Sequence, residues 1–318
     1  MISLTATHLT AQKAGRSPLK KAVFTKTGST TYGYSDWTTD QVYTTDHSEE
    51  DLDYSALVTI LNFKKNLTGL NLLGYQCVIS YGNRTTVSES AWVTATAYSL
   101  NDIVKPVTAN GYKYICTTAG TSAGSEPTWL TALGGITADG ANLKWTLYGK
   151  LGEEYINRAP LTVINKWESS SDTGLFITFE VKGTATLMSD DHASIAYNPN
   201  IGDTQTVKTL INAQIAATQA SFSHTIAYTT SWDSEDALVD VFKPADAFKI
   251  SFNQTRKDVL RNLLNHVRMT VRVGNDGKYH FAEPRNARAT TWAATTAYVL
   301  RATVKPTSSN NHIYVCTP

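Results

Sequence analysis

The side chains that could perform catalysis are scattered along this 318-residue sequence. The adjacent carboxylates Glu49-Glu50 and Glu153-Glu154 would point to opposite faces of a strand, so neither pair could flank one glycosidic bond. We expect no serine in a Gly-x-Ser-x-Gly elbow and no cysteine with a plausible histidine partner, so no triad is predicted. The sequence therefore predicts no catalytic residues and a protein that is not an enzyme.

Metal and nucleotide sites also lack the spacing that their chemistry requires. The cysteines form no Cys-x-x-Cys pair, and Asp190-Asp191-His192 is more simply explained as a solvated turn than as a metal site. A phosphate-binding loop needs clustered glycines at a strand-to-helix turn, whereas Gly134-Gly135 lies inside an aromatic-rich segment. We therefore expect no metal and no cofactor.

The charge and hydropathy patterns exclude several classes of partner. Lys and Arg together number 28 and Asp and Glu 27, so no global field would attract nucleic acid. No run of about 18 apolar residues is present, and the N-terminus lacks a basic segment followed by an apolar one, so we expect no membrane span and no export by the usual signals. Cys77, Cys116 and Cys316 stand in apolar runs and are expected to be buried as small hydrophobes.

The elements that would position any site are mostly strands. Abundant Thr, Ser, Tyr and Trp favour strands, which we predict at 42–45, 55–61, 75–81, 161–165 and 174–183. Apolar stripes predict two helices. They cover 206–218, with Asp203 or Thr204 as the cap, and 255–267, with Arg256, Lys257 and Arg261 facing outward. A β-hairpin is predicted around Gly274–Gly277. The fold class is therefore mainly β (α+β), with several small β-barrel or sandwich domains, two packed helices and an inserted small β module.

The strongest pattern is an internal repeat in which residues recur after an offset of 200 positions. The residues shared by the two copies are Trp92, Thr96, Ala97, Tyr98, Leu100, Val104, Lys105, Pro106, Asn110, Tyr114, Cys116 and Thr117, and Trp292, Thr296, Ala297, Tyr298, Leu300, Val304, Lys305, Pro306, Asn310, Tyr314, Cys316 and Thr317. The first copy continues through a further aromatic stretch, whereas the printed sequence stops at Pro318. We expect the natural polypeptide to extend further.

The aromatic residues of the first copy have two possible roles. They are Trp92, Tyr98, Tyr112, Tyr114, Trp129 and Trp145. A module of this size buries little apolar surface, so these rings are expected mainly to form its core. The alternative is that some of them are exposed and stack on sugar rings, which makes all six candidate glycan-binding residues.

Two resemblances extend this interpretation. The order Trp92, Tyr98, Val104, Gly111–Tyr114, Glu126–Trp129 and Trp145 resembles the aromatic-rich repeats of phage tail proteins and, more distantly, small chitin-binding modules of bacterial glycosidases. The segments Asp46–Glu50, Ala56–Asn62, Leu72–Tyr75, Ile79–Gly82, Phe242–Phe248, Val259–Leu264 and Asp276–Lys278 resemble tail-hub proteins of tailed phages and prophages. The second resemblance implies β-barrel domains related to the tube subunit, assembled as a ring of three.

The predicted organisation follows from the repeat and the element pattern. The domains are a first hub-like β domain (1–87), the inserted aromatic module (88–152), returning scaffold strands (153–200), an α+β domain with two helices and a hairpin (201–285) and the start of a second, truncated module (286–318).

The predicted function is that of a structural component of a phage tail tip. It would be a tail hub or baseplate hub that links the tail tube to distal tip or fibre proteins and carries peripheral modules. Its partners would be itself, as a homotrimer, and other tail proteins, and it would be made in the host cytoplasm and located in the virion tail tip. The alternative is an adhesion protein that binds host cell-surface polysaccharide through the repeated modules. A secreted polysaccharide-degrading enzyme is a remote third option.

Overall fold

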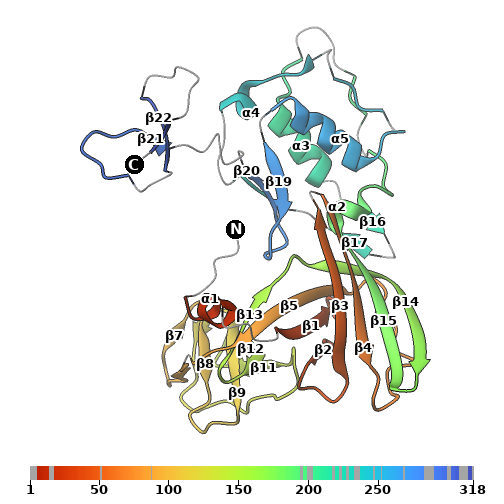
Figure 1. Cartoon of the computed structure of the whole chain (residues 1–318), viewed down its shortest axis with the longest axis vertical. Coiled ribbons are helices and arrows are strands. Elements are labelled where there is room, and N and C mark those ends of the chain that lie inside the picture. The colour runs from red at the N-terminus through yellow and green to blue at the C-terminus, as the bar shows by residue number, and fades with distance from the viewer. Residues whose placement is uncertain are drawn as a thin grey trace. The chain divides into compact units, whose positions relative to one another are not determined.

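A computed structural model describes most of the chain and divides it into two compact units, Met1–Thr184 and Ala185–Pro318 (Figure 1). The described residues are 6–13, 18–50, 52–86, 88–193, 196–198, 203–216, 219–221, 224–226, 229–232, 237–245, 248–251, 253–267, 269–282, 290–298, 302–307 and 314–316.

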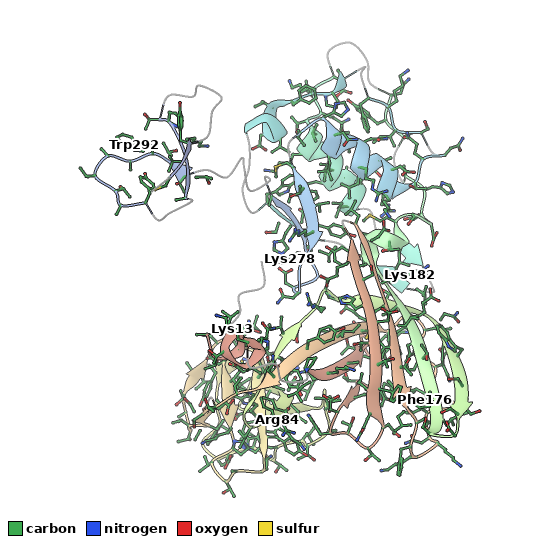
Figure 2. The ribbon with its side chains drawn as sticks, viewed as in Figure 1. Lys13, Arg84, Phe176, Lys182, Lys278 and Trp292 are labelled. Carbon is green, nitrogen blue, oxygen red and sulfur yellow. The ribbon has the colours of Figure 1, made fainter. Side chains whose placement is uncertain are left out.

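The first unit is built on one sheet that closes on itself. Its strands are β1 (Leu19–Thr25), β2 (Tyr32–Ser35), β3 (Gln41–Glu50), β4 (Asp53–Leu61), β5 (Gln76–Arg84), β13 (Glu153–Asn157), β14 (Leu161–Ser171) and β15 (Gly174–Gly183). The order is β1-β2-β3-β4-β15-β14-β5-β13, and β1 also pairs with β5. These eight strands are called the closed sheet below. Lys182 and Phe176 stand near opposite ends of β15 (Figure 2).

Alternation along the strands separates the interior of the closed sheet from its outer face. In β4 the side chains of Ala56, Val58 and Ile60 are buried, and their intervening neighbours are not. The rings of Phe24 and Phe179 meet inside, with centroids 5.1 Å apart. Helix α1 (Ala6–Lys13) packs against β5. The closed sheet therefore has a hydrophobic core of its own.

A second β structure is inserted between β5 and β13. Its strands are β6 (Ser90–Ala91), β7 (Ala97–Tyr98), β8 (Ile103–Lys105), β9 (Tyr112–Thr118), β10 (Gly120–Thr121), β11 (Ile136–Asp139) and β12 (Leu143–Lys150). Five of them form a sheet in the order β11-β12-β9-β8-β6, and β7 pairs with β10. Residues 88–152 are called the first module below.

The second unit contains the longer helices. Its elements are α2 (Thr184–Leu187, which begins at the last residue of the first unit), α3 (Val207–Ala216), β16 (Gln219–Ser221), β17 (His224–Ile226), β18 (Thr230–Trp232), α4 (Ala237–Val241), α5 (Arg256–Asn265), β19 (Thr270–Val273), β20 (Tyr279–Ala282), β21 (Thr290–Thr291), β22 (Thr303–Lys305) and β23 (Tyr314–Val315). Helices α3 and α5 pack together, and β18, β20 and β19 form a three-stranded sheet. Strands β21, β22 and β23 belong to residues 286–318, which are called the second module below.

The predicted mainly β fold is confirmed, and so are the two helices and the hairpin of β19 and β20. The cap of α3 is different from the prediction, because the hydroxyl of Thr206 accepts from the Thr209 N–H at 3.3 Å. The outward placement of Arg256 and Lys257 is wrong. Both are buried, and Arg256 pairs with Asp191 at 2.8 Å. The division of the chain also places residues 185–200 in the second unit rather than with the returning scaffold strands.

Candidate functional site

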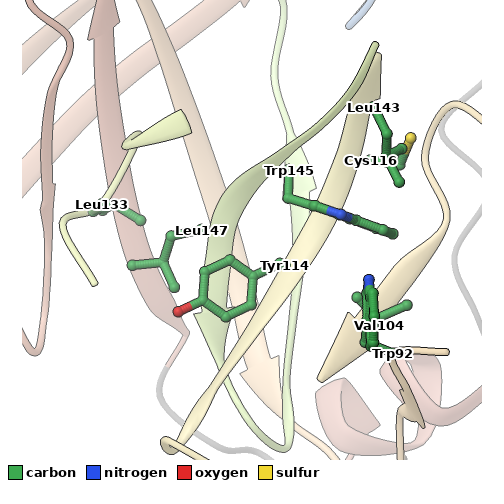
Figure 3. Close-up of a cluster of buried hydrophobic side chains, with 8 residues drawn as sticks. All are labelled: Trp92, Val104, Tyr114, Cys116, Leu133, Leu143, Trp145 and Leu147. Carbon is green, nitrogen blue, oxygen red and sulfur yellow. The ribbon is translucent and has the colours of Figure 1, made fainter. Parts of the chain in front are cut away.

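The first module is organised around a buried aromatic cluster (Figure 3). Trp92 is 6% exposed, and Tyr114 and Trp145 are fully buried. Tyr114 and Trp145 reach the core from the paired strands β9 and β12, in which Leu147 lies opposite Tyr114. Three further aromatic residues, Tyr98, Tyr112 and Trp129, are partly buried and pack against this cluster.

A buried carboxylate connects the two central tryptophans. Asp139, at the end of β11, is 3% exposed, and its Oδ2 accepts hydrogen bonds from Trp92 Nε1 at 2.8 Å and Trp145 Nε1 at 2.9 Å. Its Oδ1 accepts from the Ala123 N–H at 2.8 Å. Indole N–H groups need an acceptor when they are buried, and this single carboxylate serves both. We call the arrangement the Asp139 clamp.

The partly exposed rings are also held in place by polar contacts. The indole of Trp129 donates to Glu126 Oε1 at 2.9 Å, and the same oxygen accepts from the Val107 N–H at 2.7 Å. The Tyr98 hydroxyl accepts from the Val93 N–H at 2.8 Å. The rings of Tyr98 and Trp129 are therefore held in position by hydrogen bonds as well.

The six candidate glycan-binding residues thus fall into two groups. Trp92, Tyr114 and Trp145 form the core, as the preferred interpretation expects, and a ligand could not reach their faces without unfolding the module. The rings that remain partly open are Tyr98, Tyr112 and Trp129. Sugar binding by these three rings stays a prediction.

Ser122 lies in a Gly-x-Ser-x-Gly sequence, Gly120–Gly124, which is the pattern of a hydrolase nucleophile elbow. In an elbow the serine stands at a strand-to-helix turn with its hydroxyl exposed, whereas Ser122 is buried and follows the two-residue strand β10. Its Oγ donates to Val93 O at 2.7 Å and accepts from the Thr96 N–H at 2.9 Å. The hydroxyl therefore bonds the backbone of the module and has a structural role.

The first module is packed tightly against the hairpin of β1 and β2. Val23 and Trp37 of the scaffold lie against the aromatic cluster. Two glycines allow the closest approach. A Cβ atom on Gly33 would lie 2.5 Å from the carbonyl oxygen of Leu133, and one on Gly134 would lie 2.5 Å from the Thr31 methyl group. The backbones therefore interlock, and the module is not a loosely tethered appendage.

Buried charges lie at the same junction. Lys21 of β1 donates to the carbonyl oxygen of Tyr148 at 2.7 Å, and its ammonium lies 4.4 and 4.3 Å from the ring centroids of Tyr148 and Tyr155. Lys113 of β9 forms an ion pair with Glu89, and both side chains are buried. Scaffold and module thus share a largely buried group of ammonium, carboxylate and tyrosine side chains, in which Lys21 and Lys113 both lie over the Tyr148 ring.

The junction should make stability depend on pH. Burial lowers the pKa of Lys21 to about 7, the carboxylate of Glu153 opposes this shift, and the ammonium of Lys113 adds to it. Above pH 7 the unfolded chain therefore holds a proton on this lysine that the folded chain has lost, so the free energy of unfolding rises with pH. The expected slope approaches about 1.4 kcal/mol per pH unit between about pH 7 and 8.5, measured by urea unfolding.

Two variants make that expectation specific. Lys21→Met has a side chain of similar length that cannot bind a proton. This variant should lose the rise in the free energy of unfolding with pH. The ammonium of the neighbouring Lys20 donates to the carbonyl oxygen of Tyr43 at 3.3 Å in an exposed position, so Lys20→Met should retain the slope. Equal pH dependence of Lys21→Met and the unmodified chain would show that Lys21 is not responsible.

The residues that define this junction were missed by the sequence analysis. Lys21 and Lys113 look like ordinary surface lysines because charged side chains are rarely buried, and Asp139-Gly140 looks like an exposed turn. For Lys113, a sequence signal was its place between two tyrosines in a predicted hairpin, in the strand β9 whose neighbouring Tyr114 is buried. The acceptors and carboxylates that allow these burials come from distant parts of the chain.

The described ranges contain no group of three or more His, Cys, Asp or Glu side chains that could hold a metal ion. Asp191 of the cluster at 190–192 instead pairs with Arg256, and His47 lies 3.4 Å from Glu49. Within the same ranges, no helix combines the length and apolar character that crossing a bilayer requires.

The second module reproduces the backbone of the first at an offset of 200 residues. In both modules the backbone N–H of the tryptophan donates to the backbone carbonyl of a lysine. In both modules the backbone N–H of the next residue donates to the tyrosine hydroxyl. The first bond joins Trp92 N to Lys105 O at 2.8 Å in the first module and Trp292 N to Lys305 O at 2.7 Å in the second. The second bond joins Val93 N to Tyr98 Oη at 2.8 Å in the first module and Ala293 N to Tyr298 Oη at 2.7 Å in the second. The strand pairing of β21 with β22 and of β22 with β23 repeats that of β6 with β8 and β8 with β9. The repeat predicted from sequence is thus also a repeat in structure.

Comparison with known proteins adds little to this description. No protein-family model matches the chain, and no curated protein matches its sequence. Among solved structures it is similar to one described as the tail protein from Neisseria meningitidis MC58, with a TM-score of 0.40 and 9% identity. The match covers 89% of this chain and 58% of the other, so this chain spans less than two thirds of that protein's length. A resemblance of this size does not specify an activity or a partner.

Proposed function

We propose that this protein is a structural, non-enzymatic component of a phage tail tip, in which copies of the closed sheet associate as a ring of three. It would join the tail tube to distal tip or fibre proteins and belong to the virion. The proposal combines the sequence resemblance to tail hubs with one observation on the fold, which is a patch of exposed apolar side chains on the outer face of the closed sheet.

The patch surrounds a pair of threonines that bridge neighbouring strands. Thr59 of β4 and Thr178 of β15 lie opposite each other, and their hydroxyl oxygens are 3.0 Å apart. Trp167 of β14 is the cross-strand neighbour of Thr178 and is 40% exposed. Tyr43 of β3 is 55% exposed, and Leu57, two residues before Thr59, is exposed as well. We call Tyr43, Leu57 and Trp167 the outer patch.

The outer patch has the composition of a contact surface. Isolated apolar residues are normal on protein surfaces, but aromatic residues gathered on one regular sheet face are typical of a surface that another protein covers. At the outer patch, strands β3, β4, β15 and β14 are paired with one another in sequence, so contact there would use side chains rather than the addition of a strand. A rigid sheet that presents side chains in this way suits repeated, symmetric association.

Light scattering of the full chain tests the proposal. We expect a mass of three times 34.8 kDa, and ring-shaped particles by electron microscopy. The double variant Leu57→Lys/Trp167→Lys places two charges in the outer patch, and it should dissociate the ring at micromolar concentrations while leaving the circular dichroism spectrum unchanged. Val107→Lys, at an exposed apolar residue of the first module, serves as the matched control and should remain a trimer.

One outcome would contradict the ring, and another would contradict the outer patch as its interface. A stable monomer at high protein concentration would contradict it and would favour the alternative, an adhesion protein in which Tyr98, Tyr112 and Trp129 bind host-surface polysaccharide. A trimer that survives both patch substitutions would show that the outer patch is not the interface.

A further inference from the structure

The turn that leads into β9 holds an asparagine followed by a glycine. Asn110-Gly111 is the only Asn-Gly pair in the 318-residue sequence, and both residues are exposed in the first module. Gly111 has a φ of +86°, and a Cβ atom built on it would meet nothing within 4 Å. A glycine has no side chain to shield its backbone nitrogen from the side chain of the preceding residue. The Asn110 amide is therefore open to attack by the backbone of its own chain.

The Asn110 amide is held at both of its polar atoms. Its Oδ1 accepts from the backbone N–H of Tyr112 at 3.0 Å, and its Nδ2 donates to the Tyr114 hydroxyl at 2.9 Å. A backbone N–H can only donate, so the contact with Tyr112 fixes which atom of the amide is the oxygen. The other side of the turn is anchored as well, because the Leu151 N–H donates to the carbonyl oxygen of Gly111 at 3.0 Å. The turn thus presents an ordered side-chain amide next to an open glycine.

We propose that Asn110 is a site of spontaneous deamidation, in which the Gly111 nitrogen closes a succinimide ring on the Asn110 side chain and the Tyr114 hydroxyl protonates the departing ammonia. A bond forms between the Gly111 nitrogen and Cγ of Asn110, and the bond between Cγ and Nδ2 breaks. Gly111 loses its amide proton to solvent, and Tyr114 gives a proton to Nδ2 and regains one from solvent. Water then opens the ring. Opening at Cγ gives aspartate, and opening at the backbone carbonyl carbon gives isoaspartate.

Two contacts favour this reaction. Negative charge develops on Oδ1 when the nitrogen attacks, and the N–H of Tyr112 already donates to that oxygen, as a donor of an oxyanion hole does. The Tyr114 hydroxyl accepts from Nδ2 through its oxygen, so its own proton is available to the nitrogen as the C–N bond breaks. Tyr114 is therefore placed as the general acid, because it contacts the leaving atom.

The two products alter the turn in different ways. Aspartate keeps the backbone unchanged and replaces the amide by a carboxylate, which can accept from the Tyr114 hydroxyl. Isoaspartate inserts an extra methylene group into the backbone two residues before Tyr112, which pairs with Lys150 of β12. We expect the isoaspartate form to have a lower free energy of unfolding, because the change displaces the strand that carries the buried Tyr114.

Peptide mapping by mass spectrometry tests the site. The full chain is incubated at mildly alkaline pH, and the gain in mass that accompanies conversion of an amide to an acid is followed at each asparagine. Asn66, Asn71 and Asn142 are matched controls in the same molecule, because each is exposed and is followed by a leucine whose side chain obstructs the attacking nitrogen. We expect conversion at Asn110 while these three remain unmodified. An isoaspartyl methyltransferase should then label the peptide that contains residue 110.

Tyr114→Phe tests the role of the hydroxyl. The substitution keeps a ring in the aromatic cluster and removes the group that contacts Nδ2, so deamidation of the folded chain should slow by at least about tenfold. The circular dichroism spectrum shows whether the variant is folded. The same substitution in a synthetic peptide of residues 104–118 should leave the rate unchanged, because the peptide lacks the fold that brings the two side chains together.

Two results would overturn the inference. Conversion of Asn66, Asn71 or Asn142 at the same rate as Asn110 would show that the turn has no reactivity of its own. Equal rates in Tyr114→Phe and the unmodified chain would remove the hydroxyl from the reaction. Neither measurement depends on the oligomeric state of the closed sheet, so failure here is distinguishable from failure of the proposed ring.

Discussion

Replacing Asp139 with alanine is expected to lower the free energy of unfolding of the first module by roughly 3–5 kcal/mol. The substitution removes the acceptor of three donors at once, namely the indoles of Trp92 and Trp145 and the backbone N–H of Ala123. All three would remain buried without a partner, and the carboxylate volume would become a cavity. Asp139→Asn should lose less, because its amide oxygen can still accept from one of these donors.

Urea unfolding of the full chain, followed by tryptophan fluorescence, measures this loss. Asp172→Ala is the matched control, because Asp172 lies exposed in the turn between β14 and β15, and it should change stability by less than about 0.5 kcal/mol. A loss below about 1 kcal/mol for Asp139→Ala would show that the clamp does not hold the module together.

Gly33→Ala is the second substitution with a large expected effect, of roughly 2–4 kcal/mol in the free energy of unfolding. Its new Cβ atom would lie 2.5 Å from the Leu133 carbonyl oxygen and 2.7 Å from the Leu133 Cβ. The obstacle is backbone rather than the end of a flexible side chain, so the module must move away from the hairpin of β1 and β2. Such a movement would also disturb the packing of Trp37 and Val23 on the aromatic cluster.

Gly69→Ala separates this steric effect from the ordinary effect of replacing a glycine. A Cβ atom on Gly69 would meet nothing within 4 Å, so that variant should be neutral or slightly stabilising. Hydrogen exchange would locate the damage, with amides of β9 and β12 losing protection in Gly33→Ala only. Equal stability of the two glycine variants would indicate that module and scaffold are not interlocked at Leu133.

The predictions that the structure confirms are those that depend on local pattern. The period of two in 174–183 and the apolar stripe of 255–267 identify a strand and a helix, because each period follows from the geometry of its own element. The hairpin at Gly274–Gly277 was predictable for the same reason, since its turn chemistry lies within a few residues. The repeat required only a comparison of the sequence with itself.

Other features depend on partners that lie far away along the chain. Lys21 is buried because it meets the carbonyl of Tyr148, 127 residues later, and Trp92 is satisfied by Asp139, 47 residues later. Arg256 is buried rather than outward because Asp191 faces it. Charged and polar groups usually lie at the surface of a protein. In each of these cases the group is buried because a partner far away along the chain compensates for its loss of water.

The sequence by itself therefore determined the fold class, the individual elements and the existence of two related modules. Only the tertiary structure decided that β1 pairs with β5 to close the sheet, that the first module interlocks with the scaffold at Gly33, and that Asp139 accepts from both Trp92 and Trp145. The physical reason is that local periodicity is encoded in neighbouring residues, whereas closure of the sheet and burial of polar groups depend on partners that lie far away along the chain.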